Sequence, residues 1–250
     1  MRPPAPTYPD ISLSIFFPAY YDEHNIPKVV EGALAVVSEM GISDYEIIIV
    51  EDGSPDRTGE VADELAEKHE HVRVIHHEKN RGYGAALHTG FMAAKKENVF
   101  YTDGDNQFDL SELRRFVALL PYTDIVSGFR IQKQYSTNRK FTSATYNLVL
   151  RLLFDIHDRD VDCAFKLYPT ELFKKFEIES RDAFIDAEIA IQARLLGYKS
   201  MEVGVRHLPR MDGISTGARP TVIFRTFREI YRFYKKYGKR IKELKNTHGA

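Results

Sequence analysis

The sequence predicts an α/β protein with a doubly wound, mostly parallel sheet flanked by helices, and three observations support this. Short, continuous apolar runs alternate with helical patterns over the first half of the chain. These runs are rich in β-branched residues, which is typical of parallel strands covered on both faces. Carboxylates and turn-forming residues follow several of the runs. In such a sheet this is the edge at which ligands bind.

The first strand and helix set the pattern. Residues 12–17, SLSIFF, form a continuous apolar run, and we expect this strand to stop at Pro18. Asn25 is placed to cap a helix over residues 26–40, which has Pro27 in its first turn. The inner face of this helix is predicted to consist of Val29, Val30, Ala33, Val36 and Val37.

The alternation continues to the middle of the chain. Further strands are expected at residues 45–52, 72–76, 98–103 and 124–128. One helix is expected at residues 58–68, and a second over the small-residue stretch from Gly82, which can approach the sheet closely. Asp109 and Glu112 resemble a capping box that opens a third helix, ending at Leu120.

Beyond Arg130 the alternation breaks down. We expect a helix over residues 146–154, a strand at 165–169, a helix over 185–196 with Gly197 as its C-cap, and a strand over 198–207. The sequence has no repeat and no convincing linker. It therefore predicts a flexible arm at residues 1–10, a single domain at 11–220, and a basic aromatic helix and tail at 221–250.

The composition excludes several classes of protein. The chain of 250 residues has a formal net charge of −1, which does not fit a general nucleic-acid binder. A single cysteine, Cys163, allows no internal disulfide, so we expect a reducing compartment such as the cytosol. No run of about 18 apolar residues predicts a membrane span, and the proline-rich first ten residues lack the apolar core of a signal peptide.

Pairs of carboxylates follow three of the expected strands: Asp22 with Glu23, Glu51 with Asp52, and Asp103 with Asp105. Any one pair is explained by turn formation alone. Three pairs at one edge of a sheet favour a hard cation, because Mg²⁺ and Mn²⁺ take oxygen ligands from one or two carboxylates together with substrate phosphates. The amide of Gln107 is a further candidate oxygen ligand.

Other nucleotide-binding classes lack their motifs here. The first strand is followed by PAYYDEHN rather than a glycine-rich turn, and the chain has no phosphate-binding GKS or GKT loop. The glycines of NRGYGAALHTG follow the third strand and do not match the dinucleotide-binding pattern. Four histidines, at positions 69, 71, 76 and 77, could form a metal site, but a solvated surface is the favoured interpretation.

Four segments, FPAYYDEHNI, VEDGSPDRT, NRGYGAAL and DGDNQFD, occur in an order and spacing that resemble the inverting family 2 glycosyltransferases. DCAFKLY, FIDAEIAIQARLLGY and HLPRMDGIST extend the resemblance to the branch of dolichyl- and polyprenyl-phosphate mannosyl- and glucosyltransferases. The resemblance implies the GT-A fold, with a donor-binding half at residues 11–130 and an acceptor-side half at 131–220. The family's cofactor would be Mg²⁺ or Mn²⁺.

The resemblance also implies roles for individual residues. Contacts with the nucleotide fall to Pro18, Ala19, Tyr20, Glu23 and Asp52. Asp103 and Asp105 match the metal-binding DxD motif, where Asp103 also faces the donor, and Gln107 matches an additional metal ligand. Phosphate-binding arginines fall at Arg130 and Arg210, whose planar forks suit phosphate oxygens, and Gly213 with Ser215 completes an RxxGxS pattern.

The chain departs from the family at two places: Glu51 replaces an aspartate, and Ala164 stands where bacterial relatives can have an acidic residue. A lipid phosphate is already mostly anionic at neutral pH and needs no base, because its second pKa is about 6. A hydroxyl acceptor would need one. Asp186 or Glu188 is the candidate base, and capping of a helix start is an equally good interpretation of both.

The C-terminal segment, residues 221–240, combines aromatic residues with cations at helical spacing. Such a helix can lie in a membrane interface, or its aromatic stripe can pack on the domain, and both can hold together. The stripe consists of Phe224, Phe227, Ile230, Tyr231 and Tyr234, and the cations are Arg225, Arg228, Arg232, Lys235, Lys236, Lys239 and Arg240.

The combined expectation is metal-dependent, inverting transfer of a hexose from a nucleotide sugar to a polyprenyl (dolichyl-type) phosphate at the cytosolic membrane face. GSPD resembles the mannosyl branch, so mannose from GDP-mannose is preferred over glucose from a UDP-glucose type donor. One rival is transfer to a hydroxyl of a glycan or glycolipid. A remote rival is a non-catalytic nucleotide-sugar-binding protein.

Overall fold

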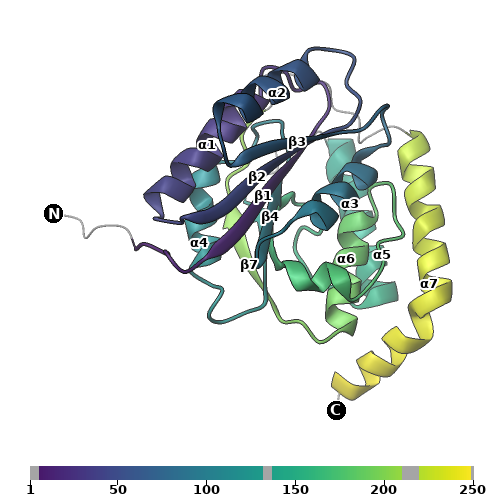
Figure 1. The fold of residues 1–250 in the computed structure, drawn as a ribbon. Coiled ribbons are helices and arrows are strands. Elements are labelled where there is room, and N and C mark those ends of the chain that lie inside the picture. The colour runs from purple at the N-terminus through teal and green to yellow at the C-terminus, as the bar shows by residue number, and fades with distance from the viewer. Residues whose placement is uncertain (1–5, 132–136, 210–219, 249–250) are drawn as a thin grey trace.

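The computed structural model describes residues 6–131, 137–209 and 220–248. For residues 137–143, 220–224 and 244–248 it describes the backbone only. Its centre is a seven-stranded sheet in the order β3-β2-β1-β4-β6-β5-β7 (Figure 1). Within this order β6 is antiparallel to both of its neighbours, and the other neighbouring strands are parallel. The predicted mostly parallel α/β fold is confirmed.

The first half follows the predicted alternation closely. Its strands are β1 (Ser12–Ala19), β2 (Asp44–Glu51), β3 (Val72–His76) and β4 (Asn98–Thr102). The helices between them are α1 (Ile26–Glu39), α2 (Thr58–Lys68) and α3 (Tyr83–Ala93). All five residues predicted for the inner face of α1 are buried. The register of β1 with β2 and β4 brings their carboxyl ends to one edge of the sheet.

Two local predictions in this half are wrong. β1 passes Pro18 and continues to Ala19; its pairing with β4 ends at Phe16, so Pro18 has a strand neighbour only in β2. A proline without a backbone N–H is tolerated where the ladder is incomplete. Asn25 precedes α1 but does not cap it with its side chain, because its amide donates instead to Asp22 Oδ1 at 3.1 Å.

The predicted capping box is half right. The Asp109 carboxylate accepts the Ser111 N–H at 3.0 Å, whereas Glu112 does not reach back to Asp109 and instead binds Arg115 and Arg206. A short 3₁₀ turn, η1 (Leu110–Glu112), leads into α4 (Leu113–Val117), which ends before Leu120.

The second half inserts an antiparallel strand beside β4. In chain order its elements are β5 (Ile125–Arg130), α5 (Thr137–Phe154), β6 (Phe165–Pro169), η2 (Thr170–Lys174), α6 (Ile185–Leu195), β7 (Ser200–Val205) and α7 (Pro220–His248). Gly197 follows α6 with φ +83°, as expected of a glycine C-cap. Because β6 pairs with both β4 and β5, residues 162–166 lie next to the exit of β4.

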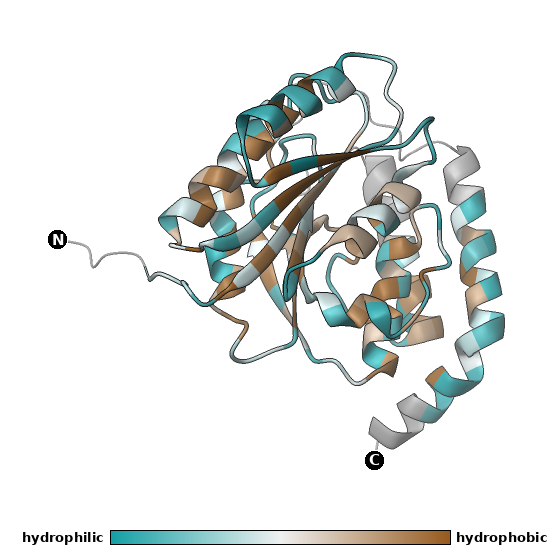
Figure 2. Ribbon diagram, in the orientation of Figure 1, coloured by the Kyte–Doolittle hydropathy of each residue, from teal (hydrophilic) through white to brown (hydrophobic). Residues whose placement is uncertain are grey.

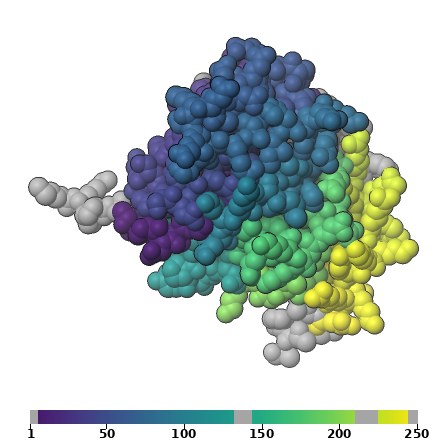
Figure 3. Space-filling view, viewed as in Figure 1, coloured from purple at the N-terminus to yellow at the C-terminus, as the bar shows by residue number. Residues whose placement is uncertain are grey.

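Two hydrophobic cores support this layout. The larger one contains the sheet, whose strands are the brown centre of Figure 2. The smaller one joins α5, α6 and α7 through the rings of Phe154, Phe184 and Phe233. The space-filling view shows α7, in yellow, lying along the green segment that includes α6 (Figure 3). α7 is therefore attached to the domain by its own apolar contacts.

The aromatic stripe of α7 is divided between packing and exposure. Ile230 is buried in the smaller core and Tyr234 is partly buried against it. Phe227 and Tyr231 are 46% and 69% exposed. The side chain of Phe224 lies outside the description. Part of the stripe therefore packs on the domain, and another part is exposed, as a helix in a membrane interface would require.

Among the residues that the structure describes, every helix is too short or too polar to cross a membrane.

Candidate active site

The loop that leaves β4 carries Asp103 and Asp105 at the carboxyl edge of the sheet. The Asp103 Oδ1 atom is buried and has no hydrogen-bond partner. Asp105 is 8% exposed, and its Oδ1 accepts the Gln107 N–H at 3.1 Å. The chain turns at Asn106, which has φ +56°. The Gln107 side chain donates to the Leu208 carbonyl at 2.9 Å, which ties this loop to the segment after β7.

The electrostatics of this loop disfavour two charged carboxylates. Burial, reinforced by the neighbouring Asp105 charge, raises the pKa of Asp103 to about 8, although a hydrogen bond from Tyr83 opposes the shift. A buried carboxylate atom without a partner costs free energy until a ligand satisfies it. A divalent cation would supply that partner, so the residues present fit Mg²⁺ or Mn²⁺.

The described residues contain no cluster of three or more His, Cys, Asp or Glu side chains able to hold a metal. The loop after β4 offers two carboxylates, those of Asp103 and Asp105. In proteins Mg²⁺ is usually held by one or two carboxylates, with the remaining positions taken by water and substrate phosphates.

The predicted nucleotide side of the site lies next to this loop. Gly104 packs against the end of β1 so closely that a Cβ there would lie 2.7 Å from the Pro18 carbonyl oxygen. Pro18 and Ala19 are thereby brought to the two aspartates. Tyr20 is half-buried, with its ring 4.7 Å from that of Tyr21, and its N–H donates to Asp22 Oδ2 at 3.2 Å.

Glu23 and Asp52 make structural contacts in the described residues. Glu23 accepts the Arg57 N–H at 3.0 Å. The buried carboxylate of Asp52 accepts the N–H groups of Arg81 and Gly82, both at 2.8 Å, and lies 2.6 Å from His77 Nδ1. Asp52 therefore fixes the NRG loop that leads into α3. Its contact with a nucleotide remains a prediction.

Arg130, the described member of the predicted pair of phosphate-binding arginines, is held in place by an ion pair. The Arg130 guanidinium binds both oxygens of Asp160, at 2.6 and 2.7 Å, and both side chains are at most 10% exposed. Such a bidentate pair fixes the plane of the guanidinium. Arg210, Gly213 and Ser215 lie outside the described residues.

The two candidate bases are buried in α6 and have structural partners. Asp186 accepts from Lys166 Nζ at 2.5 Å and from the Tyr101 hydroxyl. Glu188 accepts the N–H groups of Glu179 and Ser180, at 2.8 and 2.7 Å. The capping interpretation is wrong for both, because α6 has no side-chain cap.

Sequence reasoning missed Asp160, Asp162 and Lys166. Burial, aided by the Asp186 charge, raises the pKa of Asp162 to about 7. Lys166, the second residue of β6, is 2% exposed, and its Nζ also donates to the Val161 carbonyl at 2.6 Å. A lysine inside the apolar run FKLY was the available signal, because a buried lysine requires a carboxylate partner.

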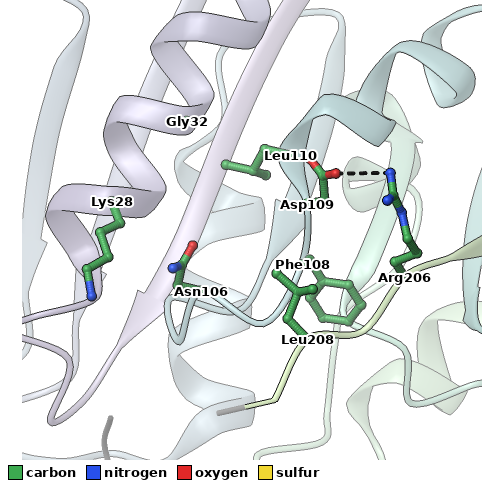
Figure 4. A pocket seen from close by; sticks show the side chains of 8 residues that line it. All are labelled: Lys28, Gly32, Asn106, Phe108, Asp109, Leu110, Arg206 and Leu208. Atoms are coloured by element: carbon green, nitrogen blue, oxygen red, sulfur yellow. Dashed lines mark hydrogen bonds and ion pairs between the residues drawn. The ribbon is translucent and has the colours of Figure 1, made fainter. Parts of the chain in front are cut away.

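A pocket of about 290 Å³ lies beside the same loop (Figure 4). Lys28 and Gly32 of α1 line one side, while Phe108 and Leu208 line another. Arg206 within it pairs with Asp109 at 3.3 Å, so part of its charge is internally balanced.

The histidines are not one patch. His77 is buried between Asp52 and Thr89, while His76 bridges Glu51 and Asp63 at the surface. The ring of His71 lies 4.5 Å from that of Tyr45. A solvated surface is thus correct for His71 and His76 but wrong for His77, which helps Asp52 to shape the site.

The model of the family described as Glycosyl transferase family 2 matches residues 14–177. Glycosyltransferase AglD of Haloferax volcanii is 29% identical, with 84% of this chain aligned to 35% of its own length. The undecaprenyl-phosphate 4-deoxy-4-formamido-L-arabinose transferase of Pectobacterium carotovorum is 31% identical, with 82% of this chain aligned to 62% of it. A dolichyl-phosphate beta-glucosyltransferase of Trichomonas vaginalis is 31% identical, with 81% of this chain aligned to 68% of it. The chain thus spans about a third to two thirds of these relatives.

Solved structures share the fold at lower sequence identity. A mannosyltransferase from Pyrobaculum calidifontis in complex with GDP-Man and Mn²⁺ has a TM-score of 0.65 and 18% identity, covering 97% of this chain and 71% of that chain. Glucosyl-3-phosphoglycerate synthase from Mycobacterium tuberculosis in complex with Mn²⁺, UDP and phosphoglyceric acid has a TM-score of 0.63 and 19% identity, covering 80% and 72%.

Proposed function

The chain belongs to glycosyl transferase family 2 and has the GT-A fold, and we propose that it transfers a hexose from a nucleotide sugar to a polyprenyl phosphate, with inversion. The observation that carries the donor half of this proposal is the buried, unpartnered Oδ1 atom of Asp103 beside Asp105. The acceptor is supported by relatives whose names specify dolichyl phosphate or undecaprenyl phosphate.

In this mechanism Asp103 and Asp105 would hold the divalent cation at the exit of β4, with Gln107 as a further oxygen ligand. When bound, the cation neutralises the diphosphate as the bond to the sugar breaks. Gly104 keeps the aspartates close to Pro18, Ala19 and Tyr20, which would contact the nucleotide together with Glu23 and Asp52. Donor and cation would then meet at one edge of the sheet.

The acceptor phosphate would be bound by Arg130, oriented by Asp160, and by Arg210 of the RxxGxS segment with Ser215. A bound phosphate dianion is itself the nucleophile, because its second pKa is about 6. Asp186 and Glu188 are both occupied by structural partners. This supports a phosphate acceptor, because transfer to a phosphate needs no base.

The donor sugar is the finer part of the proposal. GSPD favours mannose from GDP-mannose, whereas the names of the dolichyl-phosphate relatives favour glucose. The deciding experiment measures transfer from GDP-mannose and from UDP-glucose to a short polyprenyl phosphate, with Mn²⁺, with Mg²⁺ and with excess chelator. We expect metal-dependent product from one donor. Transfer unaffected by chelator, or absence of a lipid-linked product from every donor, would contradict the proposal.

One observation favours transfer to a hydroxyl as a second candidate. The raised pKa of Asp162, about 7, suits a carboxylate that removes a proton near neutral pH. A water-soluble hydroxyl acceptor belongs in the same screen, together with Asp162→Asn. If the protein transfers sugar to the hydroxyl acceptor, and Asp162→Asn abolishes this transfer, then the acceptor is a hydroxyl rather than a phosphate.

Access to a lipid acceptor would come through α7, on the cytosolic face of the membrane. Phe227 and Tyr231 are exposed on this helix, as are Arg228, Arg232 and Lys235. Anionic lipid attracts each cation near the surface by about 1 kcal/mol, and salt screens this attraction. Lys236 is a poorer contributor, because it pairs with Glu179.

Sedimentation with anionic liposomes tests this peripheral binding. The unmodified protein should sediment at low salt and less at high salt, and the triple change of Arg228, Arg232 and Lys235 to Glu should abolish sedimentation. Donor hydrolysis should be retained, since these side chains lie outside the donor site. Equal sedimentation of the triple variant and the unmodified protein would remove α7 from the proposal.

A further inference from the structure

His77, a buried histidine that the proposed mechanism does not use, comes directly after β3. Its side chain is 3% exposed, with Nδ1 2.6 Å from Asp52 Oδ1 and Nε2 2.9 Å from Thr89 Oγ1. The His77 N–H donates to the Glu51 carbonyl at 2.8 Å. The imidazole is therefore fixed at both ring nitrogens and through its backbone, between the exit of β2 and helix α3.

The partners of the two ring nitrogens determine which of them carries the hydrogen. An ionised carboxylate only accepts hydrogen bonds, so Nδ1 of His77 carries the hydrogen and donates to Asp52. The Thr89 hydroxyl can donate or accept, and it therefore satisfies Nε2 in the neutral ring as well as in the charged ring. The contact with Asp52 thus persists in both charge states of His77.

Asp52 joins three segments at the edge of the sheet. Its N–H donates to the Ala19 carbonyl at 3.0 Å, and its carboxylate accepts two N–H groups of the NRG loop, residues 80–82, both at 2.8 Å. Gly53 has φ +65°, and a Cβ there would lie 2.4 Å from the Lys79 carbonyl carbon, so the close approach of the two loops requires glycine. The orientation of this carboxylate therefore determines how the NRG loop lies beside the end of β1.

We propose that His77 is a positioning residue for donor binding: by donating to Asp52 it holds this carboxylate, and with it the NRG loop, in the arrangement that binds the nucleotide. The inference rests on the proposed function, because it deepens the assignment of Asp52 to the nucleotide side of the site. His77 and the Arg81 N–H both bind Oδ1, and the Gly82 N–H binds Oδ2. A carboxylate oxygen accepts about two hydrogen bonds, so a hydrogen-bond donor of the nucleotide would meet Oδ2. A carboxylate that is fixed in advance in this way loses less entropy when the nucleotide binds.

The test is equilibrium binding of GDP and of UDP to the full chain with Mn²⁺, measured by isothermal titration calorimetry. In His77→Asn the amide nitrogen is bonded to Cγ, as Nδ1 is, so it can still donate to Asp52. In His77→Gln the amide nitrogen lies one bond further out, as Nε2 does, so the donor to Asp52 is lost. We expect nucleotide affinity to fall about tenfold or more in His77→Gln, the effect of losing one hydrogen bond to a charged group, and to fall much less in His77→Asn.

His76→Gln is the matched control. The ring of His76 also contacts two side chains, Glu51 at 3.3 Å and Asp63 at 2.9 Å, but its side chain is 43% exposed at the surface. Nucleotide affinity should be unchanged in this variant. A double variant completes the test: if His77 acts through Asp52, adding His77→Gln to Asp52→Ala should weaken nucleotide binding no further.

The outcomes separate this inference from the proposed function. Equal losses of affinity in His77→Asn and His77→Gln overturn the role of His77, because a change in packing alone would then account for both. Wild-type affinity in His77→Gln, or additional weakening in the double variant, also overturns it and leaves the proposed donor site standing. If the unmodified protein binds neither GDP nor UDP, the inference and the proposed function are both overturned.

Discussion

Two pairs of carboxylates, one after β4 and one in the first turn of α6, both have buried oxygen atoms and differ in their partners. Asp103 keeps one buried oxygen without a hydrogen bond, beside the charge of Asp105. Asp186 and Glu188 are bound by an ammonium, a phenol and two backbone N–H groups. Burial alone therefore does not distinguish the proposed ligand carboxylates from structural ones, whereas their hydrogen-bond partners do differ.

The largest effect should come from removing the carboxylate that is proposed to bind the cation. Asp103→Asn should reduce transfer by about 10²–10³-fold or more, the range for loss of one electrostatic contact to a transition state. The folded protein should persist, because asparagine has nearly the same size and shape and introduces no charge. Initial rates at saturating donor and Mn²⁺ measure the effect. Near wild-type rates would show that the two carboxylate pairs do not differ as described.

The next effect concerns stability at the structural pair. Lys166→Met leaves Asp186 buried without its cation, and breaking a buried ion pair in this way costs about 3–5 kcal/mol. Urea unfolding measures the loss. Adding Asp186→Asn should recover a large part of it, since the unpaired charge is then gone. A single variant that loses less than about 1 kcal/mol would mean that the pair is more hydrated than its burial indicates.

Glu188→Gln should have a moderate effect of the same kind. Its carboxylate accepts two backbone N–H groups, and hydrogen bonds to a charged group contribute about 1.5–3 kcal/mol each, of which the amide oxygen retains part. We expect the free energy of unfolding to fall by about 1.5–3 kcal/mol, with the transfer rate per folded molecule unchanged. A rate that falls sharply at unchanged stability would make Glu188 a catalytic base.

The last effect, which accumulates gradually with pH, is the pH dependence of metal-free stability. The pKa of Asp103 is raised to about 8, so the folded protein binds a proton there that the unfolded chain has released above about pH 4. Stability from this group is present at low pH and is lost as the pH rises to 8. Asp103→Asn cannot lose stability in this way, because asparagine does not titrate. The free energy of unfolding of the variant, relative to that of the unmodified protein, should therefore increase by up to about 1.4 kcal/mol per pH unit between pH 4 and 8. Urea unfolding with chelator at pH 5 and pH 8 tests the sign, and an advantage that shrinks with pH would contradict it.

Much of the donor side of the molecule was predictable because its signals are local. Continuous apolar runs and helical periodicity gave α2 and β3 at their observed bounds, and strand ends marked the carboxylates. The partners of Asp186 and Glu188 were not predictable in this way. They come from β4, β6 and residues 179–180, and only the tertiary fold, with antiparallel β6 beside β4, brings them to α6.

The same distinction explains the smaller errors. Asn25 has the right residue type for a cap, but Asp22 is a closer partner for its amide. Glu112 has the right spacing for a capping box, but Arg206, 94 residues later in the chain, takes its carboxylate. In each case a long-range or better-placed partner replaced the local one that the sequence suggested.

The most direct test of the central claim is equilibrium Mn²⁺ binding, in the presence of a nucleoside diphosphate, to four variants of the full chain. The variants are Asp103→Asn, Asp105→Asn, Asp186→Asn and Glu188→Gln. Assignment of the cation to the loop after β4 predicts that the first two lose Mn²⁺ binding while the last two keep wild-type affinity. Wild-type affinity in Asp103→Asn and Asp105→Asn, or its loss in Glu188→Gln at retained fold, would contradict that assignment.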